Sequence, residues 1–132
     1  FHEASRDGLP QVTCWGTGSP RREFLHVDDL ADAAVFCLEQ WRPNADDLQF
    51  LNVGTGSDLP IRDLAALVAD AVGFRGSLDW DTSKPDGTPR KLLDVSRLKA
   101  LGWSAQIPLE EGLRATVNDY GQRQASGQEV RL

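Results

Sequence analysis

The sequence predicts an α/β fold, because strand-like and helix-like segments alternate along its 132 residues. The helix-like segments carry apolar side chains at three- and four-residue spacing. The strand-like segments are short apolar runs, and two of them end in a Gly-Thr-Gly turn. Hydrophobic residues at 40% and charged residues at 26% are ordinary for a globular protein, so we expect one domain or a large piece of one.

The first half of the chain predicts one strand and one long helix. Residues 11–15 (Gln-Val-Thr-Cys-Trp) form the expected strand. Asp28 is a favourable N-cap and Asp29 then lies at the positive end of the helix dipole, so we expect a helix over residues 29–41, ended by Pro43. Its expected buried stripe consists of Leu30, Ala33, Ala34, Cys37, Leu38 and Trp41.

The second half predicts a buried strand at residues 48–53 and a helix over 61–72, which ends at Gly73 in the C′ position. The expected apolar stripe of this helix consists of Leu64, Leu67, Val68, Ala71 and Val72. Three further segments follow, a strand at 77–80, a short helix at 96–101 and a helix at 109–123. Three short strands are few for an independent sheet, which indicates that part of the fold lies elsewhere.

Charge and composition argue against several classes of function. The net charge of −6 disfavours nucleic acid as a partner, although a few local cations suffice to bind one diphosphate. We expect no membrane span, no signal peptide and no metal site. Cys14 and Cys37 make no disulfide framework and fit a reducing, cytoplasmic location. The chain contains no methionine and begins at Phe1, so we expect it to be a piece of a longer protein.

Two polar segments carry the functional prediction. Residues 83–91 (Ser-Lys-Pro-Asp-Gly-Thr-Pro-Arg-Lys) place three cations, a carboxylate, two prolines and a glycine close together. This composition is too stiff for a linker and too polar for a core, and it suits a loop that closes over an anionic, hydroxyl-rich ligand. Residues 14–24 repeat the theme with an aromatic side chain, a glycine turn and two arginines. Together the two segments indicate recognition of a nucleotide sugar.

Trp15 and Arg22 are the candidate ligand contacts in the first segment. Trp15 can stack on a ligand or donate its indole N–H to a phosphate, and the alternative is a core tryptophan at the end of a strand. The Arg22 guanidinium can bind a diphosphate through two parallel hydrogen bonds. The alternative for Arg22 is a surface arginine paired with Glu23, which contributes little to stability.

The candidates in the second segment are Asp86 and three cations. Asp86 lies between a proline and a glycine, so its carboxylate can accept from sugar hydroxyls, shape the loop as an Asx turn, or do both. Lys84, Arg90 and Lys91 can form a cationic lid over a diphosphate, and the alternative is a solvated surface loop. His26 is a candidate general acid with a structural role as its alternative.

Five stretches of the sequence resemble the extended short-chain dehydrogenase/reductase family. They are residues 15–18 (Trp-Gly-Thr-Gly), 22–29 (Arg-Glu-Phe-Leu-His-Val-Asp-Asp), 51–56 (Leu-Asn-Val-Gly-Thr-Gly), 61–65 (Ile-Arg-Asp-Leu-Ala) and 83–94. The last stretch is the most specific. The resemblance extends from Phe1 to about Tyr120 and is strongest for members of the family that act on GDP-sugars.

The resemblance implies a Rossmann-type enzyme of which residues 1–125 are the C-terminal, substrate-binding lobe and residues 126–132 a polar tail. It implies a GDP-sugar substrate, NADP held by an N-terminal lobe that this chain lacks, and a homodimer of the full-length enzyme. It places Trp15, Arg22 and Lys91 at the substrate and favours Arg22 over Arg21. It also makes the role of His26 mainly structural.

The catalytic and cofactor motifs of this family are absent from the sequence. Tyr120 is followed four residues later by Gln124 in place of the required lysine. The Gly-Thr-Gly turn at 54–56 lacks the third glycine of a dinucleotide loop, because Leu59 stands there. We therefore expect no catalytic residue and no activity from this chain alone. Two alternatives remain, the lobe of an epimerase or dehydratase for UDP- or dTDP-sugars, and a non-catalytic binding module.

Overall fold

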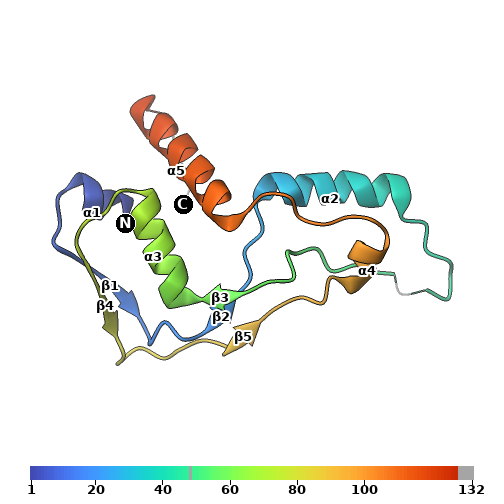
Figure 1. Ribbon diagram of the computed structural model, residues 1–132, viewed down its shortest axis with the longest axis horizontal. Helices are drawn as coiled ribbons and strands as arrows, with labels where there is room; N and C mark the ends of the chain where they lie inside the picture. The colour runs from blue at the N-terminus through green and yellow to red at the C-terminus, as the bar shows by residue number, and fades with distance from the viewer. Residues whose placement is uncertain (48, 128–132) are drawn as a thin grey trace.

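Helices and short strands alternate in the computed structural model, which describes residues 1–47 and 49–127. The elements are α1 (His2–Arg6), β1 (Gln11–Trp15), β2 (Arg21–Arg22), α2 (Val27–Gln40), β3 (Leu59–Pro60), α3 (Ile61–Ala71), β4 (Ser77–Asp81), β5 (Arg90–Lys91), α4 (Ser96–Ala100) and α5 (Leu109–Ala125). This architecture confirms the predicted α/β class. In Figure 1, α1, α3, β1 and β4 lie towards one end of an elongated molecule and α2 and α4 towards the other, while α5 projects outwards between them.

The strands of the described residues form two small sheets. β1 and β4 pair in parallel, with Gln11 opposite Ser77 and Trp15 opposite Asp81, which confirms the strands predicted at 11–15 and 77–80. The second sheet has the order β3-β2-β5, with β2 antiparallel to β3 and parallel to β5. These three strands were not predicted, because two residues are too few to show the two-residue alternation of a strand.

Helix α2 begins at Val27, before the predicted start, and its N-cap differs from the prediction. The N-cap is His26, whose Nδ1 accepts the backbone N–H of Asp28 at 3.3 Å, so the prediction of Asp28 as the cap was wrong. Asp29 is only 5% exposed and accepts the N–H groups of Gln106 and Ile107 at 3.1 and 3.0 Å. This carboxylate therefore fixes the segment that leads into α5 against the start of α2.

Two hydrophobic clusters stabilise the part of the chain that the structure describes. The first contains Ala4, Ala69 and Phe74, with Phe1, Val12, Val72 and Leu78 packed around them. The second contains Ala33, Leu98 and Trp103, with Leu25, Phe36, Cys37, Leu51, Val53 and Ala105 packed around them. The stripe predicted for α2 is therefore only partly correct, because Ala33 and Cys37 face the second cluster while Leu30 and Leu38 are 50% and 78% exposed.

The strand predicted at residues 48–53 is not formed by residues 49–53, and Leu48 lies outside the described residues. The segment is extended and held by side chains. Leu51 and Val53 pack on the second cluster, and the Asn52 amide donates to the carbonyl of Asp94 at 3.0 Å. Within the described part of the chain no strand pairs with this segment, so it does not form the hydrogen bonds that define a strand.

Helices α3, α4 and α5 follow the prediction closely, whereas α1 was not predicted. Pro60 caps α3, and Gly73 adopts the left-handed φ of 72° that the C′ position requires. The N–H groups of Gly73 and Phe74 return to the last turn of the helix, to the carbonyls of Asp70 and Ala69. α4 matches the expected short helix, and α5 extends two residues beyond its expected end. Among the described residues, no helix is long and apolar enough to cross a membrane.

Candidate functional site

The two polar segments that carried the functional prediction lie side by side, although about seventy residues separate them. β2 pairs with β5 so that Arg21 is opposite Arg90 and Arg22 is opposite Lys91 (Figure 1). Further along, the Lys84 ammonium lies 5.6 Å from the centroid of a Trp15 ring. Paired residues of neighbouring strands share a face of the sheet, so Arg22 and Lys91 lie on the same face.

Asp86 closes the loop between these segments. Its Oδ1 accepts the N–H of Thr17 at 2.8 Å, and its Oδ2 accepts the hydroxyl of Thr17 at 2.6 Å and that of Ser19 at 3.4 Å. These hydrogen bonds, led by the Thr17 hydroxyl, lower the pKa of Asp86. Gly16 has a φ of 80°, and a Cβ there would collide with the Asp86 carboxylate. The loop-shaping role of Asp86 is thus present, and it leaves the carboxylate exposed at the site.

Arg22 is half-buried and is not paired with Glu23. One of its terminal nitrogens donates to the carbonyl of Arg21 at 2.7 Å, and the other lies beside Gly87, where a Cβ would be 3.2 Å away. Glu23 instead accepts the N–H groups of Gly56 at 2.5 Å and Leu93 at 3.1 Å. The carboxylate of Glu23 therefore joins three segments of the chain and does not neutralise Arg22.

Asp58 engages two other arginines. Its side chain is 3% exposed and accepts from Nε of Arg90 at 2.5 Å and from Nε of Arg21 at 2.9 Å. The Arg90 hydrogen bond, followed by that of Arg21, lowers the pKa of Asp58. Arg90 therefore differs from its expected role in a cationic lid, because its guanidinium is held by Asp58. Sequence reasoning missed Asp58 and Glu23, since each acts on partners more than thirty residues away.

Trp15 is 74% exposed, so it is not a core residue, and that alternative was wrong. It stands at the end of β1 beside the 83–91 segment, with the exposed Lys84 over its ring. The structure thus places Lys84 beside Trp15, Asp86 against the turn that follows Trp15, and Lys91 opposite Arg22. An aromatic ring, three cations and a carboxylate therefore lie on the two paired segments.

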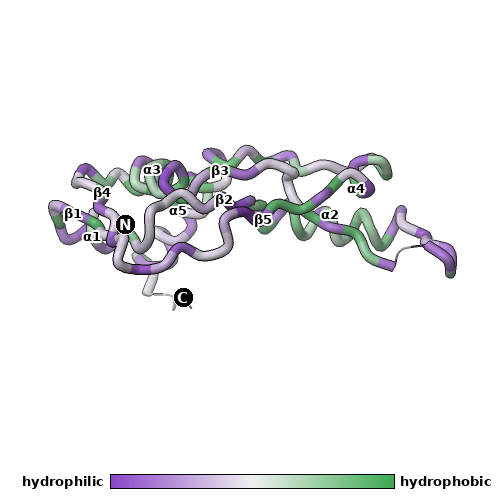
Figure 2. The backbone as a smooth tube through the Cα atoms, turned by 90° about the horizontal axis from the view of Figure 1, so that it is seen from below, coloured by the Kyte–Doolittle hydropathy of each residue, from purple (hydrophilic) through white to green (hydrophobic). Residues whose placement is uncertain are grey.

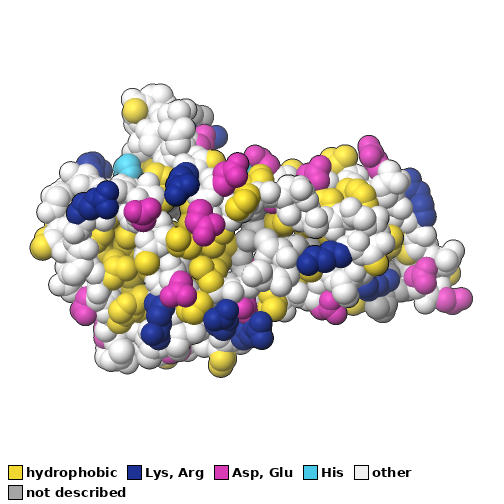
Figure 3. Space-filling model, in the orientation of Figure 1, with side chains coloured by type: hydrophobic (Ala, Val, Ile, Leu, Met, Phe, Trp, Pro, Cys, Tyr) yellow, Lys and Arg dark blue, Asp and Glu magenta, His cyan; other side chains and the backbone are white. Residues whose placement is uncertain are grey.

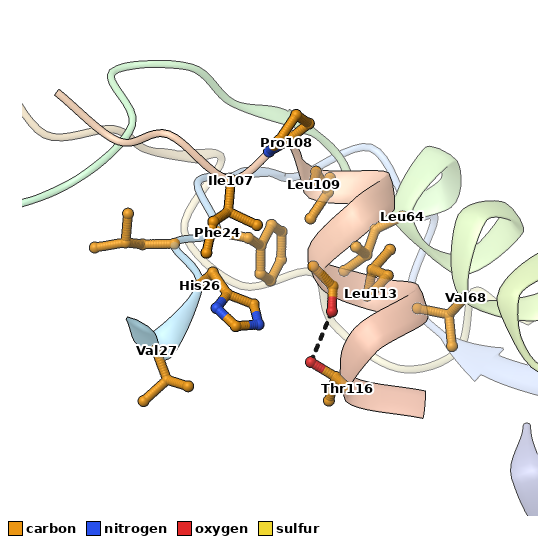
Figure 4. Close-up of a pocket in the computed structure, with 12 residues that line it drawn as sticks. Phe24, His26, Val27, Leu64, Val68, Ile107, Pro108, Leu109, Leu113 and Thr116 are labelled. Carbon is orange, nitrogen blue, oxygen red and sulfur yellow. Dashed lines mark hydrogen bonds between the residues drawn. The ribbon is translucent and has the colours of Figure 1, made fainter. Parts of the chain in front are cut away.

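A large, mainly apolar cavity lies elsewhere among the described residues. Its volume is about 390 Å³, and none of the six predicted site residues lines it. Its lining includes Phe24, His26, Val27, Leu64, Val68, Ile107, Pro108, Leu109, Leu113 and Thr116 (Figure 4). His26 projects there between the start of α2 and α5, and its ring packs against Gly112. Because His26 caps α2, the structure supports its structural role.

The described part of the chain contains neither a group of metal-binding side chains nor an activated thiol at Cys14. No group of three or more His, Cys, Asp or Glu side chains could hold a metal ion there. Burial raises the pKa of the Cys14 thiol, so this group is not an activated thiolate.

Comparison with known proteins agrees with the resemblance in the sequence. Residues 1–54 match the model of the NAD dependent epimerase/dehydratase family. The chain is 53% identical over 120 residues to GDP-L-fucose synthase 1 of Arabidopsis thaliana, and 52% identical over 121 residues to GDP-L-fucose synthase of Escherichia coli. This chain is a homologue of GDP-L-fucose synthases. The two alignments cover 91% and 88% of this chain but only 36% and 38% of the two relatives, so the chain spans little more than a third of their length.

Solved structures show the same relationship. A GDP-6-OMe-4-keto-L-xylo-heptose reductase from C. jejuni is 37% identical with a TM-score of 0.79, over 86% of this chain and 34% of that one. The GDP-mannoheptose C4 reductase of Campylobacter jejuni, solved with NADP bound, is 34% identical with a TM-score of 0.79, over 91% of this chain and 41% of that one. The predicted relationship to a Rossmann-type epimerase/reductase fold is confirmed.

Proposed function

We propose that this chain is the GDP-sugar-binding lobe of a GDP-L-fucose synthase, with residues 1–125 forming the lobe. The observation that carries the proposal is the pairing of β2 with β5, which sets Arg22 opposite Lys91 beside an exposed Trp15. Two cations on one face of a sheet suit a diphosphate, and the indole offers a flat surface to the nucleoside. The 52% identity to the enzyme of Escherichia coli makes GDP the expected nucleotide.

The full-length enzyme would convert GDP-4-keto-6-deoxymannose to GDP-L-fucose by epimerisation at C3 and C5 and reduction at C4. The C4 ketone acidifies the neighbouring carbons because it stabilises the enolate that forms when they lose a proton. NADPH, held by a lobe outside this chain, supplies the hydride for the reduction. We assign no catalytic residue to this chain, and the chain alone would be inactive.

The residues of this chain bind and orient the substrate. The Arg22 guanidinium would contact two phosphate oxygens at once, while Lys91 and Lys84 would act as point charges on the same diphosphate. Asp86 keeps lone pairs beyond its bonds to Thr17 and would accept from a ribose or sugar hydroxyl. Binding energy collected far from the reacting carbons holds the sugar ring in position for the chemistry.

The glycine turn at residues 54–56 does not fit a dinucleotide. Gly54 is buried, and a Cβ there would stand 2.6 Å from the Glu23 carboxylate. The N–H of Gly56 is donated to the same carboxylate, so the space that a phosphate would need holds a negative charge. We therefore assign NADP to the lobe outside this chain. We also propose, from the resemblance to the family, that the full-length enzyme is a homodimer.

The test uses a hybrid synthase, defined as the Escherichia coli enzyme with its matched segment replaced by this chain. Isothermal titration with GDP-mannose and with UDP-glucose compares the two nucleotides. The proposal predicts that GDP-mannose binds at least about tenfold more tightly, a difference of roughly 1.4 kcal/mol. Equal affinities, or tighter binding of UDP-glucose, would favour the lobe of a UDP-sugar enzyme. Absence of binding by a folded hybrid synthase would favour a non-catalytic module.

A further inference from the structure

Four cations face one another on two short strands. β2 consists of Arg21 and Arg22, and β5 consists of Arg90 and Lys91. Their parallel pairing sets Arg21 opposite Arg90 and Arg22 opposite Lys91. Figure 3 shows Lys and Arg side chains gathered over the part of the molecule where these strands lie, and Figure 2 colours both strands as hydrophilic. Like charges directly opposite each other destabilise a strand pair, so this pairing needs a compensating charge.

The two cationic pairs lie on opposite faces of the sheet, because consecutive residues of a strand point to alternate faces. Arg21 and Arg90, which we call the opposed arginines, share one face. Arg22 and Lys91, the two cations of the proposed anion site, share the other. Each strand is only two residues long, so few backbone hydrogen bonds hold the pair. The spacing of Arg22 and Lys91 therefore depends on what keeps the opposed arginines together.

The Asp58 carboxylate supplies a negative charge to both opposed arginines. One of its oxygens accepts from Nε of Arg21 at 2.9 Å, and the other accepts from Nε of Arg90 at 2.5 Å. The backbone carbonyl of Asp58 also accepts from a terminal nitrogen of Arg21 at 2.8 Å. The hydrogen bond from Arg90, followed by that from Arg21, lowers the pKa of Asp58, so the carboxylate is ionised at neutral pH.

Asp58 is placed to link all three strands of the sheet. It immediately precedes β3 at one edge, and the order β3-β2-β5 puts Arg90 at the other edge (Figure 1). Its side chain is 3% exposed, whereas those of Arg21 and Arg90 are 43% and 60% exposed. Among the ion pairs of the described residues, none includes Arg22 or Lys91. The charge on one face is thus compensated within the chain, and the charge on the other face remains for a ligand.

We propose that Asp58 is a positioning residue for the diphosphate: it offsets the repulsion between the opposed arginines, keeps β2 paired with β5, and so keeps Arg22 opposite Lys91. The inference rests on the proposed function, in which Arg22 and Lys91 are the phosphate contacts. Asp58 itself would not touch the ligand, because its carboxylate is enclosed by the opposed arginines. A diphosphate then meets two cations whose spacing is set before it binds, which lowers the ordering cost of binding.

Charge-matched variants of the hybrid synthase test the proposal. Asp58→Asn keeps the shape of the side chain and removes its charge, and we expect it to raise the Kd for GDP-mannose at least about fivefold. Adding Arg21→Gln to Asp58→Asn restores the net charge of the three side chains. This double variant should return the Kd to within about twofold of the parent. Arg21→Gln alone is the control, and it should also stay within about twofold because Asp58 still compensates Arg90.

Salt dependence separates this charge effect from a merely structural role of Asp58. The repulsion between the opposed arginines is screened by salt, because both side chains reach solvent. The Kd of Asp58→Asn divided by that of the parent should therefore fall at least about twofold between roughly 50 mM and roughly 500 mM salt. Loss of shape alone would leave this ratio constant.

Hydrogen exchange at Arg21 reports the strand pairing without a ligand. The N–H of Arg21 donates to the carbonyl of Pro89 at 2.8 Å, at the start of the paired segment. Asp58→Asn should raise the exchange rate of this amide at least roughly tenfold, and the double variant should restore it to within about threefold. If the folded parent does not bind GDP-mannose, the proposed function fails, while these rates still test the pairing.

Several outcomes would overturn the proposal. They are an Arg21 amide that exchanges no faster in Asp58→Asn than in the parent, a parent and an Asp58→Asn variant with equal Kd values, and a Kd ratio that salt does not change. A double variant that binds no better than Asp58→Asn would also overturn it. If Asp58→Asn does not fold, the double variant decides alone. Binding close to that of the parent then supports the proposal, and failure of the double variant to fold or to bind refutes it.

Discussion

Asp86 accepts two hydrogen bonds from Thr17, one from its backbone N–H at 2.8 Å and one from its hydroxyl at 2.6 Å. The two residues are 69 positions apart, so this contact fixes the 83–91 loop against the turn that follows β1. In the same loop, Lys84 lies beside Trp15 and Gly87 lies beside Arg22. The shape of the proposed anion site thus depends on a carboxylate.

The lowered pKa of Asp86 predicts an acid-sensitive loop. A carboxyl whose pKa is depressed by folding contributes stability above its unfolded pKa, near 3.8, and loses it as the pH falls through the lower native pKa. The melting temperature of Asp86→Asn should therefore fall less steeply than that of the parent between about pH 5 and pH 3. Asp79→Asn, at an exposed position on β4, is the control. Parallel curves for the parent and Asp86→Asn would contradict the prediction.

Removal of the site cations should weaken binding of GDP-sugar. Arg22→Ala and Lys91→Ala in the hybrid synthase should each cost about 1.5–3 kcal/mol, with the exposed Lys91 at the lower end, because each removes a hydrogen bond to a charged phosphate. This corresponds to a rise of roughly 10- to 150-fold in the Kd measured by calorimetry. Arg75→Ala, on the exposed turn before β4, should leave Kd unchanged. Unchanged isotherms for both site variants would remove these residues from the site.

Two glycines of α5 should respond in opposite ways to alanine. A Cβ on the buried Gly112 would stand 2.9 Å from the His26 ring, which is held as the cap of α2. Gly112→Ala should destabilise the chain by about 1–3 kcal/mol, as overpacking does. At Gly121 nothing lies within 4 Å, so alanine there should gain up to about 1 kcal/mol from helix propensity. Urea denaturation measures both, and equal stabilities would show that His26 does not pack against α5.

The buried carboxylate of Asp29 should be far more important for stability than its exposed neighbour. Asp29→Asn replaces an acceptor of two backbone N–H groups by an amide that presents its own donor to one of them. We expect a loss of about 1.5–3 kcal/mol in the free energy of unfolding. The control is Asp28→Asn, whose side chain is 78% exposed. A loss no larger than that of the control would show that the segment at 106–107 is held by other contacts.

The longer elements could be predicted from the sequence because local signals define them. The periodicity and the glycine after α3 predicted the limits of this helix within one residue, and the predicted limits of β1 agree with the structure. The strand at 48–53 was wrong for residues 49–53, because a strand needs a partner and sequence periodicity does not supply one. The exposure of Leu30 and Leu38 was also not predicted. Two faces of α2 are apolar, so the sequence alone did not show which face is buried.

The members of the candidate site could be predicted, but not how they are held. The composition of residues 83–91 indicated a ligand loop, and its contact with residues 14–24 follows in the structure. Nothing in the local sequence showed that Asp58 would hold Arg90, or that Glu23 would accept from Gly56 and Leu93. These bonds join distant segments, and only the fold brings their partners together. The structure was therefore needed to show that Arg90 is paired with Asp58, whereas Arg22 donates to the carbonyl of Arg21.

A crystal structure of the hybrid synthase with GDP-mannose tests the central claim most directly. The account predicts that the diphosphate lies within hydrogen-bond distance, about 2.7–3.2 Å, of the Arg22 guanidinium and the Lys91 ammonium. It also predicts that the ligand contacts the Trp15 ring. Density for the diphosphate at a place remote from the paired strands β2 and β5 would contradict it.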